Sequence, residues 1–216
     1  MTNKYDLIFP IGPACRPAYY LELSKIRKCA YPFDWLGINL KTILKLFQEN
    51  FNNFFLEYKE QKEVIDERYR HVIDSNEIIC AHHIPFDISL SEGVENFREL
   101  MNKRFKRLKE NIEKSSNICM ITNRNIDEKE LIEFLNDFSK LYKDKKIDLI
   151  NIRNIKENEY QKEIIINSNL KFIEFGFQDI NILGDNPHTN SKFWLGNEEK
   201  WLKIMEYLKE RKKVNE

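Results

Sequence analysis

Cys15 is the side chain in this sequence best placed to act as a nucleophile. It follows the short apolar run of residues 5–11 through a Gly12-Pro13-Ala14 turn, and a helix is expected to begin near Arg16. Unpaired N–H groups at a helix N-terminus, together with the positive charge of Arg16, favour a thiolate and lower the pKa of the thiol. We therefore predict that Cys15 is a nucleophile if a histidine reaches it. Two other interpretations stay open: Cys15 packs in the turn, or the turn binds an anion through its backbone.

Two adjacent histidines, His82 and His83, are the candidate general bases. Because adjacent side chains on a strand point to opposite faces, at most one of them faces a given site. Asp34 or Asp87 would orient that histidine. The alternative is a histidine ring that is satisfied by a neighbouring carbonyl. We expect no metal site, because adjacent histidines on an extended strand cannot both ligate one ion without distortion.

Short apolar runs alternate with amphipathic helical patterns along most of the chain, and this alternation indicates the fold. It predicts an α/β fold: a three-layer, Rossmann-like domain with a mostly parallel sheet and helices on both faces. No linker or repeat divides the sequence, so we expect a single domain over residues 1–216. The expected strands are residues 5–11, 77–82, 117–122 and 147–152, with strand-like segments at 163–166 and 170–175. The expected helices are residues 16–27, 40–58, 94–113, 128–142 and 198–212.

Polar side chains follow each predicted strand, and this placement indicates where a ligand would bind. In open α/β sheets, ligands bind beyond the carboxyl ends of the strands. The loop of residues 184–190 is either a lid that carries an alternative base or an ordinary exposed loop. The candidate substrate-binding residues are Gly12, Arg16, Trp35, Arg124, Arg153 and His188.

The charge balance bears on the class of partner. The chain has 35 Lys and Arg residues against 35 Asp and Glu residues, so its formal net charge is zero. This balance argues against a nucleic-acid binder, because neutralising phosphates needs a basic excess. One predicted helix is basic between residues 98 and 109, but interspersed glutamates favour a solvated face.

Apolar runs and cysteine usage bear on the location of the protein. No run approaches the roughly 20 apolar residues of a membrane-spanning helix, and the N-terminal run is too short and interrupted for a signal peptide. Cys29, Cys80 and Cys119 are expected to be reduced and structural, since the sequence has no CxxC pair. We therefore predict a cytoplasmic protein without a membrane span, and the sequence predicts no oligomeric state.

Several segments together resemble a known family. Residues 5–15 with their Gly-x-x-Cys turn, followed by residues 23–27 and the Pro-Phe-Asp-Trp motif of residues 32–35, are similar to the N-terminal signature of a bacterial and viral family of unknown function. That family is labelled "putative papain-like cysteine peptidase". Residues 81–86, the basic segment 103–108 and residues 194–201 resemble its later segments. The resemblance implies that Cys15 is a nucleophile and that a histidine is its base. Papain-type enzymes pair a helical half with an antiparallel β half, whereas this sequence alternates strands and helices.

Three hypotheses for the function follow. In the first, a cysteine-dependent hydrolase uses Cys15, His83 or His82, and Asp34 or Asp87, with N–H groups of the Gly12–Arg16 turn as oxyanion donors. In the second, a glycan or nucleotide-sugar transferase of surface-polysaccharide synthesis binds phosphate at the turn, with Arg124 or Arg153 neutralising it. The resemblance suggests this alternative through neighbouring polysaccharide genes. The third is a non-catalytic binding module that uses tryptophans such as Trp35. The expected ligand is a small molecule, peptide or glycan, with no cofactor.

Overall fold

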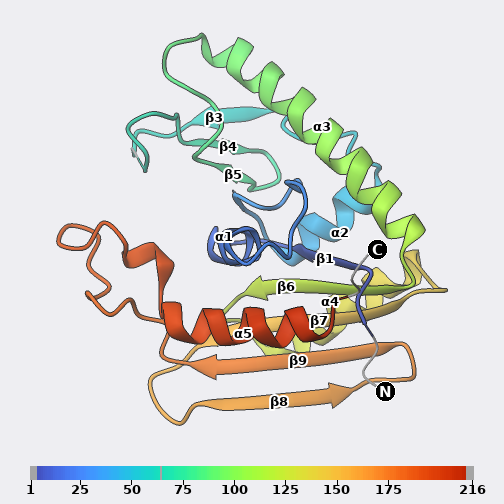
Figure 1. The fold of residues 1–216 in the computed structure, drawn as a ribbon. Coiled ribbons are helices and arrows are strands. Elements are labelled where there is room, and N and C mark those ends of the chain that lie inside the picture. The colour runs from blue at the N-terminus through green and yellow to red at the C-terminus, as the bar shows by residue number, and fades with distance from the viewer. Residues whose placement is uncertain (1–3, 64, 213–216) are drawn as a thin grey trace.

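The computed structural model describes residues 4–63 and 65–212, and in these residues the larger sheet has five strands (Figure 1). Four neighbouring strands pair in parallel, and the fifth pairs antiparallel at one edge. The described residues therefore form a mixed α/β fold with a mostly parallel sheet. In spatial order the strands are β1 (Leu7–Pro10), β6 (Asn117–Asn123), β7 (Lys146–Asn154), β9 (Leu170–Phe177) and β8 (Tyr160–Ile165).

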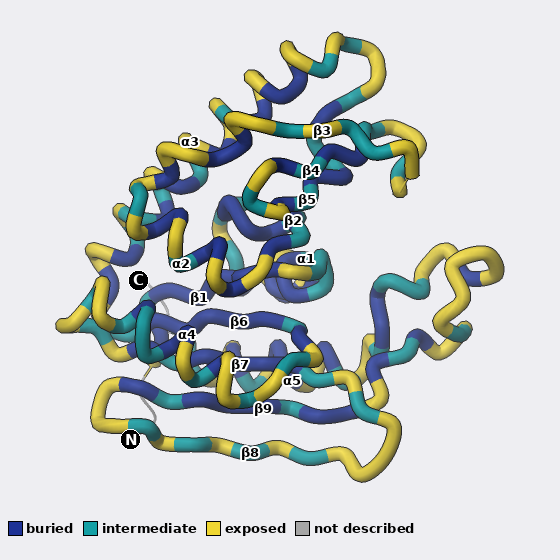
Figure 2. The backbone as a smooth tube through the Cα atoms, turned by 180° about the vertical axis from the view of Figure 1, so that it is seen from behind, coloured by how far each residue is buried: buried dark blue, intermediate teal, exposed yellow. Residues whose placement is uncertain are grey.

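Apolar side chains alternate between the two faces of this sheet, and the two sets pack with different helices. On one face, Phe9 and Met120 pack in a cluster with α4 (Glu128–Leu141). On the other face, Ile8 and Ile121 pack with α1 (Arg16–Leu23) and α5 (Glu198–Glu210). Figure 2 shows that the central strands are mostly buried, whereas β8 is exposed along much of its length.

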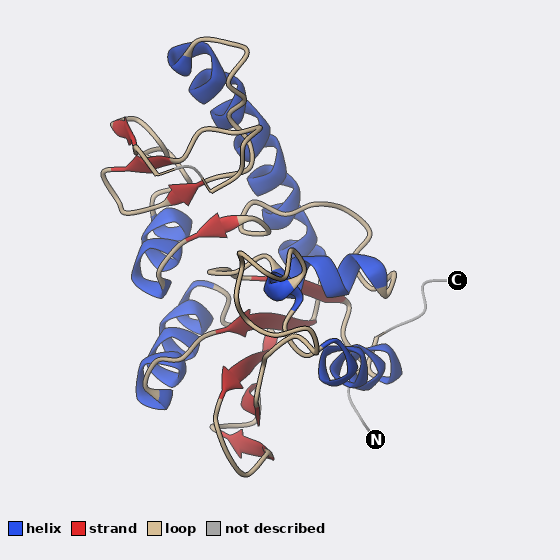
Figure 3. Ribbon diagram, turned by 90° about the vertical axis from the view of Figure 1, so that its left-hand side faces the viewer, coloured by secondary structure: helices blue, strands red, loops and turns tan. Residues whose placement is uncertain are grey.

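A second, antiparallel sheet lies beyond the β1 edge of the larger one (Figures 1 and 3). In the described residues its four short strands lie in the order β2-β5-β4-β3, and a long helix extends beside both sheets. The sequence pattern does not predict this sheet. Its elements are β2 (Leu36–Gly37), β3 (Tyr58–Glu60), β4 (Val72–Asp74) and β5 (Ile79–Cys80), and the helices beside it are α2 (Leu40–Gln48) and α3 (Leu90–Lys114).

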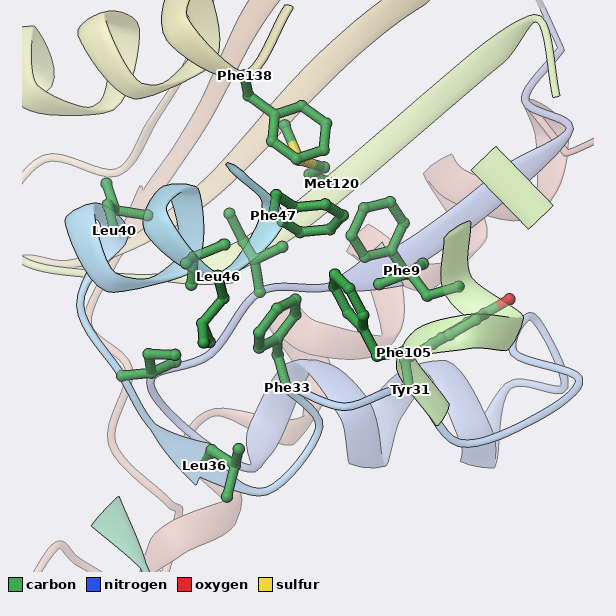
Figure 4. Packing of buried hydrophobic residues seen from close by; sticks show 14 of the residues in the cluster. Phe9, Tyr31, Phe33, Leu36, Leu40, Leu46, Phe47, Phe105, Met120 and Phe138 are labelled. Atoms are coloured by element: carbon green, nitrogen blue, oxygen red, sulfur yellow. The ribbon is translucent and has the colours of Figure 1, made fainter. Parts of the chain in front are cut away.

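Aromatic side chains join the two parts of the molecule (Figure 4). The ring of Phe47 on α2 lies 5.1 Å from the ring of Phe105 on α3 and 5.0 Å from that of Phe138 on α4. Phe51 stacks on Phe105 with ring centroids 4.1 Å apart. The buried cluster therefore runs from the larger sheet through α4 and α2 to α3.

Three predictions about local structure are wrong in their type or their bounds. The helix predicted for residues 40–58 ends at Gln48, because Asn50, Phe51 and Phe55 adopt positive φ angles that an α-helix excludes. The strand predicted at residues 77–82 is β5 of the small sheet and not a strand of the parallel sheet. The helix predicted for residues 16–27 ends earlier, at Leu23.

The strand order also limits the Rossmann-like prediction. Strands β1, β6, β7 and β9 follow one another in chain order, without the reversal that forms a crevice in doubly wound sheets. The three-layer, Rossmann-like arrangement therefore stays a prediction, and the strand order provides no switch point for a ligand.

The C-terminal segment fixes the first turn of α1. Arg16 forms an ion pair with the buried carboxylate of Asp179 at 2.5 Å, and Asp179 also accepts a hydrogen bond from the Trp201 indole at 3.0 Å. The Trp201 ring stacks on that of Tyr20 at 5.1 Å. Gly196 has a φ of +63°, and a Cβ there would lie 2.1 Å from the Asp179 carboxylate, so only glycine fits.

We predict that Phe47→Ala lowers the free energy of unfolding by about 3–5 kcal/mol, because it removes the ring that contacts α3 and α4. Urea denaturation measures this loss. Leu202→Ala, which truncates a half-exposed side chain on α5, should change stability by less than about 1 kcal/mol. Equal losses in the two variants would contradict the central role of Phe47.

Candidate active site

The turn that carries Cys15 lies where β1 leaves the larger sheet. Gly12 has a φ of +58°, and its carbonyl accepts a hydrogen bond of 2.5 Å from the Thr122 hydroxyl on β6. A Cβ on Gly12 would lie 2.9 Å from the Ile38 side chain, so the turn packs tightly against the chain beyond β2. Cys15 is the N-cap of α1, but its side chain makes no capping hydrogen bond.

The thiol of Cys15 is less acidic than the sequence predicts. Burial raises its pKa from 9.0 to about 11, and the opposing effect of the Arg16 charge is smaller. The Arg16 charge is directed at Asp179, which neutralises it. The expected lowering of the pKa is therefore wrong, because the removal of the thiol from water outweighs the favourable charge.

His82 forms the contact expected of a general base, but with an unexpected partner. Its Nδ1 lies 3.4 Å from the Asp66 carboxylate, and its ring meets that of Trp35 edge to face at 6.1 Å. Hydrogen bonds from Arg68 hold the pKa of Asp66 well below its usual range, so this carboxylate is charged at neutral pH. Asp66 is therefore placed to fix the orientation of the His82 ring.

His83 lies in a different environment, beside an arginine. Its Nε2 is 3.4 Å from Nη1 of Arg104, and its ring lies 5.2 Å from that of Phe97. Burial, with a smaller contribution from Arg104, lowers the pKa of His83 to about 3. His83 is consequently neutral at physiological pH.

Neither carboxylate expected to orient a histidine contacts one. Asp34 is fully buried, pairs with Arg27 and accepts a hydrogen bond of 2.9 Å from the Tyr31 N–H. Asp87 lies on an exposed loop and makes no hydrogen bond or ion pair within residues 4–63 and 65–212. His188 is likewise exposed, on the loop of residues 184–190.

Strand β2 contacts both the Cys15 turn and the segment that leads to the two histidines. Leu36 pairs with Cys80, two residues before His82, and the Leu36 carbonyl would lie 3.1 Å from a Cβ on Gly12. Both segments therefore border the same short strand. No hydrogen bond joins Cys15 to a histidine in the described part of the chain.

Arg124 connects the turn to the second sheet. Its Nη2 donates to the carbonyls of Ile11 at 3.0 Å and Ile38 at 2.7 Å, and its Nε donates to the Thr122 hydroxyl at 3.1 Å. Burial lowers the pKa of Arg124 to about 10. The contacts of this side chain are therefore with main-chain and hydroxyl oxygens of the fold.

Arg153 belongs to a hydrogen-bond network around Glu174, a fully buried residue of β9. The carboxylate accepts from Arg153 at 2.9 Å, Asn151 at 2.7 Å and Tyr160 at 2.7 Å. Burial alone would raise the pKa of Glu174, but these donors and Lys162 lower it to about 2. Asn151 pairs with Thr122 on the neighbouring strand β6, so polar side chains continue across the sheet from Glu174 to Arg124.

Sequence reasoning missed Asp66, Asn151, Glu174 and His71. The polar residues Asn151 and Glu174 each interrupt an apolar strand run, which was an available signal of a buried network. Asp66 lies in a stretch without periodicity and carried no such signal. Both ring nitrogens of the buried His71 lack hydrogen-bond partners among the described residues.

Several surface cavities lie away from Cys15 and the two histidines. One of about 620 Å³ lies between α3 and the turn after α2. Cys15, His82 and His83 line neither this cavity nor the other well-formed ones of the described residues. In the same residues, no group of three or more His, Cys, Asp or Glu side chains is arranged to hold a metal ion.

The fold and these groups define a mixed α/β protein with a half-buried cysteine at a strand exit and a separate histidine–aspartate pair. Residues 6–157 match the family model described as "putative papain-like cysteine peptidase", and the chain belongs to this family. The matched region contains Cys15, Asp66, His82 and Arg124, whereas Asp179 and Trp201 lie beyond it. No curated protein and no solved structure matched the chain. No helix of the described residues is both long and apolar enough to cross a membrane.

The raised pKa of Cys15 predicts slow alkylation of the folded protein. A pKa of about 11 instead of 9.0 leaves about 100-fold less thiolate at neutral pH, because each pKa unit is a factor of ten. Iodoacetamide labelling, followed by mass spectrometry of the Cys15 peptide, should show this ratio between native and urea-unfolded protein. Equal rates in the two states at neutral pH would contradict it.

The lowered pKa of Glu174 predicts acid sensitivity. Because its folded-state pKa of about 2 lies below the ordinary value of 4.5, the carboxylate stabilises the fold above pH 4.5, and this contribution is lost as the pH falls towards 2. Glu174→Gln should cost about 3–5 kcal/mol at neutral pH and flatten the decline in stability between these pH values. Denaturation midpoints across this range measure both effects.

Glu163→Gln provides a control for the acid-sensitivity experiment, because Glu163 forms a partly exposed pair with Lys171. This variant should keep the wild-type pH dependence. An unchanged pH dependence in Glu174→Gln would show that the network does not cause it.

Proposed function

We propose that this protein is a cysteine-dependent hydrolase in which Cys15 attacks an acyl carbon and His82, oriented by Asp66, accepts the thiol proton. The His82–Asp66 contact of 3.4 Å carries the proposal, because it supplies an oriented imidazole in the matched region of the chain. The family description suggests a peptide bond as the substrate.

The raised pKa of Cys15 determines the form of the proposed mechanism. A thiol that is protonated in the free protein must lose its proton as it attacks, so no thiolate–imidazolium pair is formed beforehand. Sγ bonds to the acyl carbon while the proton passes to Nε2 of His82. The imidazolium then protonates the leaving amine or alcohol, and water hydrolyses the thioester.

Approach of His82 to Cys15 upon substrate binding is part of this proposal. The two segments both border β2, and catalytic hydrogen bonds often tighten only in the substrate complex. Backbone N–H groups of the Gly12–Arg16 turn would stabilise the developing oxyanion. No cofactor enters the reaction.

The transferase alternative has less support. It relied on Arg124 or Arg153 to neutralise a phosphate, but Arg124 donates to three oxygens of the fold and Arg153 pairs with Glu174. The binding module is the second candidate, and the observation that favours it is the protonated, half-buried thiol of Cys15.

Acyl transfer to Cys15 tests the hydrolase. Incubation with p-nitrophenyl acetate should release p-nitrophenolate and leave an acetyl group on Cys15, detected by peptide mass spectrometry. Cys15→Ala should abolish this release, and His82→Ala should slow it about 10²–10⁴-fold, the usual contribution of a general base. Asp66→Asn should slow it less.

Two matched variants control the acylation experiment. Cys29→Ala removes another half-buried thiol, and His188→Ala removes an exposed histidine, so both should retain the wild-type rate. Acetylation that persists at full rate in His82→Ala, or that falls on other cysteines only, would favour the binding module.

A further inference from the structure

Two arginines of α3 point into the molecule, although the sequence predicts a solvated helix face. Arg104 and Arg107 are half-buried, whereas Lys103 and Lys106 on the same helix are exposed. The two arginines are three residues apart and therefore share one side of the helix. They lie against the segment of residues 27–34, which follows α1.

Arg104 has guanidinium donors without protein partners. Its Nη1 contacts His83 at 3.4 Å, and its Nε and Nη2 donate to no acceptor in the described residues. Burial, followed by the nearby charges of Arg107 and Arg27, lowers the pKa of Arg104. The free Nε–Nη2 edge is the edge with which arginine binds a carboxylate or phosphate through two hydrogen bonds.

Arg107 is held in place but is also incompletely paired. Its Nη2 donates to the Ala30 carbonyl, while its buried Nε has no hydrogen-bond partner among the described residues. His83 Nδ1 is a second buried atom without a partner in the same neighbourhood. Polar atoms left in this state cost free energy that a ligand would recover.

The local charges do not balance. Arg27 forms ion pairs with the buried Asp34 and the exposed Glu22. Neither Arg104 nor Arg107 forms an ion pair within the part of the chain that the structure describes. His83 adds no negative charge. Two half-buried guanidinium groups are thus held close together without a counter-charge, which is unfavourable unless an anion is bound.

We infer that Arg104 and Arg107, beside His83, form a binding site for an oxyanion, the phosphate or carboxylate group of a small ligand. Arg104 would bind two oxygens through its Nε–Nη2 edge, and Arg107 would add the second positive charge. The planar guanidinium group of arginine matches two oxygens of a carboxylate or phosphate, whereas a lysine supplies only a point charge. The site does not depend on the chemistry of Cys15.

Thermal unfolding of the full chain tests this inference. Inorganic phosphate at roughly ten times its dissociation constant should raise the midpoint by about 2–5 °C relative to sodium chloride of matched ionic strength. Arg104→Gln and Arg107→Gln should lose most of this shift. Lys103→Gln removes an exposed charge from the same helix and should retain it.

Acetate replaces phosphate in a second arm. A rise in the unfolding midpoint with phosphate but not with acetate indicates a ligand with a phosphate group. A rise with acetate indicates a ligand with a carboxylate group. No shift with either anion, or an undiminished shift in Arg104→Gln, would overturn the inference.

Arg104→Lys keeps the charge but removes the Nε–Nη2 edge, so it should weaken phosphate binding about tenfold in calorimetry. This variant tests two-point binding even if the glutamine variants fail to fold. Unchanged phosphate affinity in this variant would contradict binding of two oxygens by the Nε–Nη2 edge of Arg104. Cys15→Ser should keep the full shift, so failure of the proposed hydrolase would leave this result unaffected.

Discussion

The buried guanidinium group of Arg124 lies where the two sheets meet, and the position of the candidate site depends on it. It connects the end of β1 to the residue after β2 through carbonyl oxygens, while Thr122 connects the same region to Gly12. Carbonyls at strand ends need donors when they are buried, and one arginine supplies several. The turn that carries Cys15 is therefore fixed by hydrogen bonds to the small sheet as well as by its own strand.

Burial at this junction has an electrostatic consequence. Burial removes Cys15 from water, and the loss of hydration disfavours the thiolate more than Arg16 favours it. The same junction places His82 beside Asp66 and His83 beside Arg104. The adjacent histidines have different partners, although both lie in the bend after β5 and not on a strand.

The elements with strong local periodicity could be predicted from the sequence. Residues 117–122 and 147–152 agree with β6 and β7, and residues 128–142 agree with α4, because continuous apolar runs and amphipathic spacing are local signals. The aromatic residues after Gln48 continue the helical spacing, but their packing on α3 overrides it. The two-residue strand β2 and the partner Asp66 have no local signature. The acidity of Cys15 could not be predicted either, since burial depends on residues distant in the chain.

The ion pair between Arg16 and Asp179 has a consequence during biosynthesis. Residues near 180–200 are synthesised long after α1, and at typical elongation rates the intervening chain takes on the order of 10–40 s. Until Asp179 and Trp201 leave the ribosome, Arg16 lacks its counter-charge and Tyr20 lacks its stacking partner. The first turn of α1, which begins directly after Cys15, therefore reaches its final set of contacts only after the C-terminal segment has been synthesised.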